Sequence, residues 1–172
     1  EFKNVDILFG KATDEGLRML DAGSTRAEIL DTCGVVLGAA KANLTVRQGE
    51  ISVLMGLSGS GKSTLLRGVN GLNAVTRGSI LVRDGEGMVD VVSCDEPTLR
   101  KVRQKAVAMV FQQFALLPWR TVEENVGFGL ELAGVPDAER KAMVGKQLEL
   151  VGLSQWKNKF AHELSGGMQQ RV

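Results

Sequence analysis

Residues 56–64 read GLSGSGKST, and their types and spacing are those of a phosphate-binding loop. Gly56, Gly61, Lys62 and Ser63 occupy the fixed positions of the pattern GxxxxGK[ST]. Glycines let backbone N–H groups turn toward phosphate oxygens, and a following helix adds the partial positive charge of its N-terminus. Lys62 supplies a positive charge near the β- and γ-phosphates, and Ser63 supplies a hydroxyl ligand for Mg²⁺. The residues predicted to bind nucleotide here are Gly56, Leu57, Ser58, Gly59, Ser60, Gly61, Lys62, Ser63 and Thr64.

The segments on either side of the pattern support its interpretation as a P-loop. Residues 51–55 (ISVLM) are apolar without alternation, which predicts a strand covered on both faces. Residues 62–70 predict a helix that ends at Gly71. The alternative is a Gly/Ser-rich turn that matches the pattern by chance, and the four fixed positions together with the two flanking elements argue against it. The pattern therefore predicts a P-loop nucleotide-binding protein, and it leaves kinases, GTPases and motors open.

Other segments show local signals for strands and helices. Residues 2–9 alternate, with Val5, Ile7 and Phe9 on one face of a predicted strand. Residues 10–34 break this pattern, and the pair Thr25 and Glu28 predicts a short capped helix there. The remaining expected elements are a strand at 40–46 with a turn at 47–50, a hairpin at 78–92 turning at Asp84, Gly85 and Gly87, a buried strand at 106–111, and helices at 121–134 and 136–152.

The composition suits one globular domain of 172 residues, with 24% charged residues and a net charge of +1. This charge gives no basic footprint for nucleic acid. No apolar run is long enough to cross a bilayer, and the acidic start without Met is not typical of a signal peptide. Cys33 and Cys94 are far apart and in no CxxC spacing, which predicts reduced thiols, as in the cytosol.

Two further stretches indicate a family. Residues 164–171 (LSGGMQQR) resemble the signature of ATP-binding-cassette (ABC) ATPases, and residues 109–126 resemble the Q-loop region, with Gln112 at the Q-loop position. The likeness is greatest to the ATPase subunits of importers for glycine betaine, choline and related quaternary amines. It implies an α/β P-loop NTPase fold of ABC type, with an incomplete core sheet, an antiparallel β subdomain and a helical subdomain. The expected division is a β-rich P-loop part at 1–111 and a helical part at 112–172.

The signature has a physical reading of its own. Ser165, Gly166 and Gly167 predict a Ser-capped, glycine-rich helix start with N–H groups free to receive an anion. Without the P-loop, an ordinary capped helix would be the better interpretation. The resemblance implies a head-to-tail pair with a second copy, in which Ser165, Gly167 and Gln169 act on the nucleotide of the partner.

Several other side chains are candidates for a functional role. The resemblance makes Lys62 and Gln112 the catalytic groups, with Gln112 also a Mg²⁺ ligand beside Ser63, while Gln113 is expected to be a solvated loop residue. Trp119 and Phe128 belong either to a surface that receives a permease helix or to the core of the helical part. His162, the only histidine, is interpreted as a loop or capping residue.

Binding of the base is less well defined by the sequence. Many relatives stack adenine on an aromatic residue, whose place here falls near 33–36, where none occurs, and the chain has no Tyr. Either Phe9 substitutes, if the segment 10–34 folds back, or adenine is held loosely.

The Walker B aspartate, the catalytic glutamate and the switch histidine of the family follow the signature, and the sequence ends before them. The expectation is a fragment that binds ATP and Mg²⁺ without hydrolysing ATP, and whose open sheet edge lowers its solubility. The resemblance places the whole protein at the cytoplasmic face of the inner (plasma) membrane, with permease subunits and a separate solute-binding protein as partners. The alternatives are a non-transport ABC ATPase acting on nucleic acid or ribosomes, and a nucleotide- or partner-binding fragment without turnover.

Overall fold

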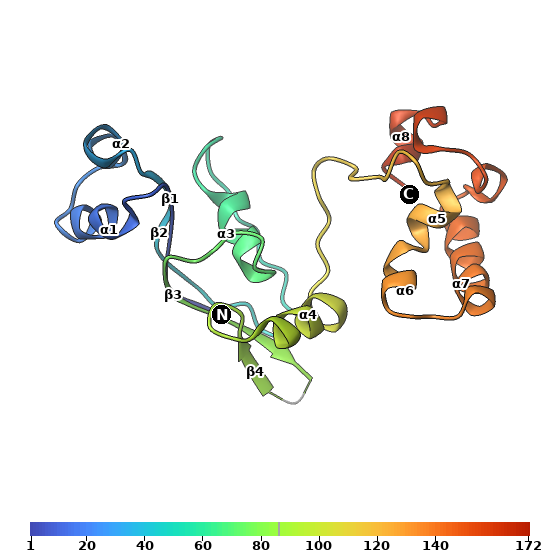
Figure 1. The fold of residues 1–172 in the computed structure, drawn as a ribbon, viewed down its shortest axis with the longest axis horizontal. Helices are drawn as coiled ribbons and strands as arrows, with labels where there is room; N and C mark the ends of the chain where they lie inside the picture. Colours follow the sequence, from blue (N-terminus) through green and yellow to red (C-terminus); the bar gives the residue numbers. More distant parts are fainter. Residues whose placement is uncertain (86) are drawn as a thin grey trace. The chain divides into compact units, whose positions relative to one another are not determined.

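The computed structural model describes residues 1–85 and 87–172 and divides the chain into two compact units (Figure 1). Unit 1 comprises Glu1–Ala108, and unit 2 comprises Met109–Val172. The division lies close to the one expected after residue 111. Each unit has its own hydrophobic core and is described by itself below.

Unit 1 is built on an antiparallel sheet of four strands in the order β2-β1-β3-β4. The strands are β1 (Phe2–Phe9), β2 (Val36–Leu44), β3 (Arg77–Asp84) and β4 (Gly87–Asp90). The expected strand at 2–9 and the β3–β4 hairpin are confirmed, and residue 86 of its turn lies outside the described residues. The strand expected at 40–46 begins earlier, because Val36 already pairs with Phe9.

Helices cover both faces of β1, since its side chains enter two different clusters. Val5 and Ile7 pack with residues of α3 (Lys62–Val69) and α4 (Glu96–Lys105). Leu8 packs instead with the helices α1 (Thr13–Asp21) and α2 (Arg26–Cys33). Helices α1 and α4 were not predicted, although Asp95 caps α4 by accepting a hydrogen bond from the Thr98 N–H at 3.0 Å.

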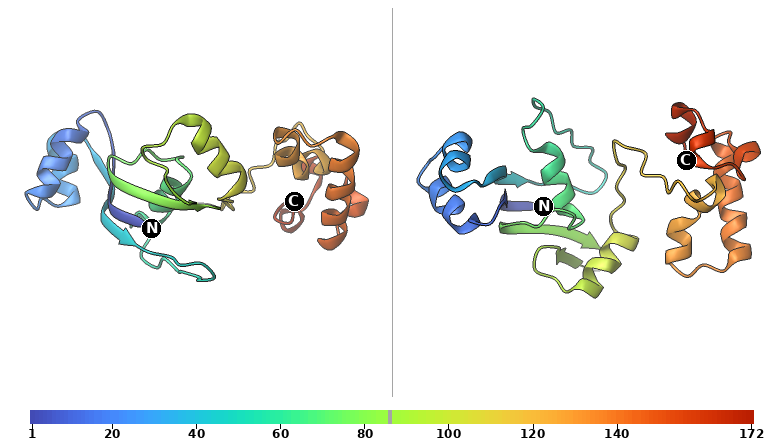
Figure 2. Two further views of the ribbon diagram at one scale, coloured as in Figure 1. Left: turned by 90° about the horizontal axis from the view of Figure 1, so that it is seen from below. Right: turned by 45° about the horizontal axis from the view of Figure 1, so that its top comes forward.

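The connection between β1 and β2 contains both α1 and α2, which lie side by side at the end of these strands (Figure 2). The predicted capping box is present, with Thr25 and Glu28 bonded to each other's backbone N–H. These bonds from Thr25 hold the pKa of Glu28 below its usual value. Gly34 ends α2 at a φ of 67°, a left-handed conformation that glycine adopts without strain.

One buried carboxylate joins the parts of unit 1. Asp6 on β1 is 1% exposed and accepts hydrogen bonds from the Lys41 N–H of β2 at 2.6 Å and from Arg77 Nε of β3 at 2.7 Å. Arg77 also forms a two-point ion pair with Asp21 at the end of α1, with contacts at 2.7 and 2.8 Å. Hydrogen bonding from Arg77 lowers the pKa of Asp21. Three strands and a helix therefore meet at one charged network.

The predictions of a strand covered on both faces at 51–55 and of a buried strand at 106–111 are wrong. Residues 51–57 and 107–111 form no strand, and Ile51, Met55 and Val110 are 92%, 87% and 97% exposed. A strand needs a neighbour for its N–H and C=O groups, and an apolar strand needs cover on its faces. Within the part of the chain that the structure describes, no strand pairs with either stretch.

Unit 2 is helical. Its elements are α5 (Val122–Val126), α6 (Phe128–Leu132), α7 (Asp137–Leu150), α8 (Gly166–Gln169) and the 3₁₀ turns η1 (Ser154–Trp156) and η2 (Ala161–Glu163). The helix expected at 121–134 is divided at Gly127, where a Cβ would lie 3.3 Å from Val144 of α7. The helix expected at 136–152 is confirmed as α7.

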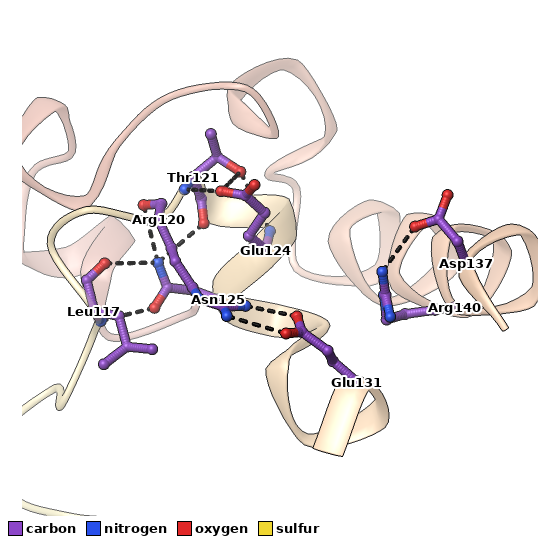
Figure 3. Close-up of polar contacts among 8 residues, drawn as sticks. All are labelled: Leu117, Arg120, Thr121, Glu124, Asn125, Glu131, Asp137 and Arg140. Carbon is purple, nitrogen blue, oxygen red and sulfur yellow. Dashed lines mark hydrogen bonds and ion pairs between the residues drawn. The ribbon is translucent and has the colours of Figure 1, made fainter. Parts of the chain in front are cut away.

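The segment before α5 is held by the side chain of Asn125 (Figure 3). Its amide nitrogen donates to the carbonyl groups of Leu117, Arg120 and Thr121 at 2.9–3.1 Å, and its oxygen accepts from the Leu117 N–H at 2.8 Å. Arg120 pairs with Glu131 of α6 at 2.6 Å, and this pairing lowers the pKa of Glu131. The irregular chain entering unit 2 thus has a fixed local shape.

Two negative sequence expectations also bear on the fold. Cys33 and Cys94 are free thiols in this structure, and burial raises the pKa of Cys94. Among the described residues, no helix is both long and apolar enough to cross a membrane.

Replacing Asp6 by alanine should destabilise unit 1, because Arg77 and the Lys41 N–H lose a buried acceptor. We expect the free energy of unfolding to fall by about 2–4 kcal/mol, measured by urea denaturation followed by circular dichroism. Asp14→Ala removes the same charge from an exposed site on α1 and serves as the control. Equal unfolding midpoints for Asp6→Ala and the parent would contradict this assignment.

Candidate phosphate-binding site

The predicted P-loop lies in unit 1 as an irregular loop that leads into α3. Gly61 is the N-cap of α3 at a φ of 94°, and Gly59 has a φ of 77°. Both are left-handed conformations that favour glycine. A Cβ on Gly61 would collide with the carbonyl oxygen of Gly38 on β2. The second fixed glycine of the pattern is therefore required by its conformation and by the strand behind it.

The side chain of Lys62 folds back over the loop. Its Nζ donates to the carbonyl oxygens of Gly56 and Leu57, both at 2.8 Å, and to the hydroxyl of Ser60 at 3.3 Å. The ammonium thus lies inside the curve of the loop, bonded to neutral acceptors. A phosphate there would meet this charge together with the N-terminus of α3. These residues fit a triphosphate.

Arg26 contacts the same loop from α2. Its Nη1 donates to the Gly59 carbonyl oxygen at 3.1 Å. Its Nη2 makes longer contacts to the carbonyl oxygens of Ser60 at 3.4 Å and Gly38 at 3.5 Å. The helical connection between β1 and β2 therefore folds back onto the loop, which is the condition under which Phe9 could substitute for the missing aromatic residue.

Phe9 lies next to the start of α3. It pairs with Val36 in the sheet, so the last residue of β1 lies opposite residues 33–36, the stretch in which many relatives have an aromatic residue. A Cβ on Gly38 would lie 2.7 Å from the Phe9 ring and 2.8 Å from the Thr64 methyl group. Phe9 is 41% exposed, so part of the ring faces solvent close to the loop.

Ser63 and Thr64 occupy the first turn of α3. Ser63 is exposed, which leaves its hydroxyl accessible to a metal ion. The Thr64 carbonyl accepts a hydrogen bond from Asn73 Nδ2 at 3.1 Å. Of the two predicted Mg²⁺ ligands, Ser63 belongs to unit 1 and Gln112 belongs to unit 2, where Gln112 and Gln113 are both exposed.

The signature residues lie in unit 2. Ser165 is the N-cap of α8, in an extended conformation, and its side chain makes no capping hydrogen bond. Gly166 and Gly167 are exposed, and a Cβ on either would meet open space. The Gln169 amide donates to the carbonyl oxygens of Ala161 and Leu164 at 2.9 and 3.2 Å, so it secures the preceding turn.

Three other side chains considered from the sequence are also in unit 2. Trp119 is exposed, whereas Phe128 is half-buried with the Arg120 guanidinium 4.8 Å from its ring centroid. His162 is exposed in η2 and stacks on Phe160, with centroids 5.8 Å apart. Its position in a surface turn agrees with the loop interpretation.

The family model described as ABC transporter matches residues 39–172, which include the P-loop, the Q-loop region and the signature. The chain belongs to the ABC transporter family. This ABC transporter chain is 44% identical over its full length to the glycine betaine/proline betaine transport system ATP-binding protein ProV of Escherichia coli. It is 48% identical over 99% of its length to the glycine betaine transport ATP-binding protein OpuAA of Bacillus subtilis. It spans 42% and 40% of these relatives.

Solved structures confirm the fold class of this ABC transporter chain. The dimeric structure of MJ0796, a bacterial ABC transporter cassette, matches with a TM-score of 0.76 and 28% identity over 99% of this chain and 65% of that one. The post-hydrolysis state of the same cassette, bound to ADP and Pi, matches with a TM-score of 0.75 and the same identity and coverage.

Sequence reasoning missed Arg26. Its only signal is electrostatic: a cation in the first turn of a helix faces the partial positive charge of the helix N-terminus. Such a residue is unfavourable for its own helix, which indicates a contact elsewhere. Its partners, 33 and 34 residues away, are backbone carbonyl groups that the sequence does not mark.

Proposed function

We propose that this chain is the nucleotide-binding part of an importer ATPase that takes up glycine betaine or a related quaternary amine. The observation that carries the binding assignment is the position of Lys62 inside a loop whose glycines and following helix suit a triphosphate. The substrate class comes from the relatives, which are named for glycine betaine and proline betaine transport. ATP and Mg²⁺ are the proposed ligands.

The phosphates are bound by the loop residues 56–64, with Lys62 supplying the positive charge and Ser63 a hydroxyl ligand for Mg²⁺. Phe9 stacks on the base: its partly exposed ring borders Thr64, and stacking on an aromatic face suits adenine. Magnesium, when bound, neutralises charge on the β- and γ-phosphates, and Gln112 is its proposed second protein ligand.

A second copy of the chain completes the site in this proposal. Ser165, Gly166, Gly167 and Gln169 act on the nucleotide of the partner, which two observations support: the signature lies within the matched family span, and the similar MJ0796 cassette is dimeric. The whole protein would act with permease subunits and a separate solute-binding protein, at the cytoplasmic face of the membrane. Trp119 is an exposed candidate for the surface that receives the permease.

Nucleotide binding should depend on Lys62, because its ammonium makes charge-assisted hydrogen bonds to phosphate. Lys62→Ala should weaken binding of a fluorescent ATP analogue by about tenfold or more. Gln113 is an exposed glutamine next to Gln112, and the control variant Gln113→Ala should bind the analogue with the affinity of the parent. If Lys62→Ala and the parent bind with equal affinity, the loop is not the nucleotide site.

The chain of 172 residues should bind ATP without turning it over. The described hydrogen bonds of the loop involve backbone N–H and carbonyl groups, a hydroxyl, Lys62 and Arg26, and none of them involves a carboxylate that could position water. Such a group contributes roughly 10²–10⁴-fold to hydrolysis. We expect background phosphate release at saturating ATP, and turnover from a version extended through the segments that follow the signature in longer relatives. Steady release by the 172-residue chain, abolished by Lys62→Ala, would disprove this.

The substrate class can be tested in cells that express the whole protein. Chromosomal Lys62→Ala should reduce uptake of radiolabelled glycine betaine at high osmolarity to background, while uptake of an unrelated sugar continues. Neighbouring genes should encode a permease and an aromatic-caged solute-binding protein. Unchanged betaine uptake in the variant would reject the substrate and leave the ATPase assignment standing.

A further inference from the structure

Arg26 occupies a position in α2 where its charge does not help the helix. It is the first helical residue, directly after the N-cap Thr25. A cation in the first turn is repelled by the partial positive charge of the helix N-terminus. The capping box of Thr25 and Glu28 nevertheless fixes this turn, so the Arg26 backbone is held in place. The guanidinium is then directed to acceptors outside its own helix.

Those acceptors are carbonyl groups around the P-loop. The shortest contact is Nη1 to the Gly59 oxygen at 3.1 Å, and Nη2 reaches the Ser60 oxygen at 3.4 Å. The same Nη2 lies 3.5 Å from the oxygen of Gly38, the residue that backs Gly61. The planar guanidinium presents several donors in a fixed fork, so one side chain can hold neighbouring peptide groups in a fixed orientation.

The orientation of these peptide groups decides what the loop offers to an anion. In a trans peptide unit the C=O and the N–H point in opposite directions. When the Ser60 carbonyl faces Arg26, the N–H of Gly61 faces away from Arg26. In the described part of the chain, no acceptor is bonded to the Gly61 N–H. This group therefore remains available to a phosphate oxygen.

We propose that Arg26 is a positioning residue for the P-loop: it holds the Gly59 and Ser60 carbonyl groups away from the phosphates and so presents the Gly61 N–H to them. The Ser60 N–H, which shares a peptide unit with the Gly59 carbonyl, donates instead to the Leu57 oxygen at 3.2 Å and closes the loop. The inference rests on the proposed function, since it takes the loop to be a phosphate site. Arg26 lies outside residues 39–172, which the family model matches, so the contact joins the helical connection to the matched part of the chain. Nucleotide binding and the order of α2 are consequently coupled.

The test compares the parent chain with Arg26→Ala, Arg26→Lys and the control Arg18→Ala. Arg18 is an exposed arginine of α1, so its removal changes the charge by the same amount in the same segment. Binding is measured by displacing a fluorescent ATP analogue with ATP or with inorganic tripolyphosphate. Amide hydrogen exchange of a peptide covering residues 57–63, without nucleotide, gives a readout that does not require binding.

Arg26→Ala should weaken the binding of ATP and of tripolyphosphate by the same factor, roughly threefold to tenfold. It should also speed exchange in residues 57–63 while the thermal midpoint of the chain is unchanged. Arg26→Lys keeps the charge but loses the fork, so its affinity should fall between those of the parent and Arg26→Ala. Phe9→Ala should weaken the binding of ATP but not of tripolyphosphate, because tripolyphosphate has no base.

Parent-like affinity and exchange in Arg26→Ala would overturn the inference. Equal weakening by Arg18→Ala would also overturn it, because a general charge effect would then suffice. Arg26→Ala could unfold α2, which would be seen as complete exchange across residues 26–33, and Arg26→Lys then decides the question. Parent-like affinity and exchange in Arg26→Lys overturn the proposal, whereas values between those of the parent and Arg26→Ala support it. If the parent binds neither probe, the proposed function fails, and the exchange of residues 57–63 still decides whether Arg26 orders the loop.

Discussion

Burying a carboxylate is unfavourable unless donors surround it, and Asp6 obtains its donors from the strands on both sides of β1. Because Arg77 continues to Asp21, the same network fixes α1 to the sheet. The sheet in turn places Gly38 behind the P-loop and Phe9 beside it. The phosphate site contains no part of this network. The positions of Gly38 and Phe9 next to the P-loop nevertheless depend on the network, because it holds the strands together.

A second principle concerns the irregular segments of both units. Their carbonyl groups cannot pair in a sheet or helix, so long side chains supply the donors. Lys62 and Arg26 do this for the P-loop, and Asn125 and Gln169 do it for the segments before α5 and α8. These four residues give loops a defined shape where packing alone would not.

The sequence predicted what local signals encode. Capping pairs such as Thr25 and Glu28, and the hairpin of β3 and β4, were found because their interactions span few residues. The stretches at 51–55 and 106–111 were assigned wrongly, because apolar content shows that a segment is suited to burial but does not show what covers it. The pairing of Phe9 with Val36 and the reach of Arg26 were not predictable, since both depend on where a helical connection folds back.

The pairing of Phe9 with Val36 has a topological consequence. The chain leaves the sheet after Phe9 and re-enters it at Val36, which is the direct partner of Phe9. Helices α1 and α2 therefore form an insertion between the two strands of an antiparallel hairpin. A tight turn joining these two positions would preserve the strand order. The segment that contains α1 and α2 is thus modular in its connectivity. It is not modular in chemistry, because its removal would expose Leu8 and Leu37 and withdraw Arg26 from the loop.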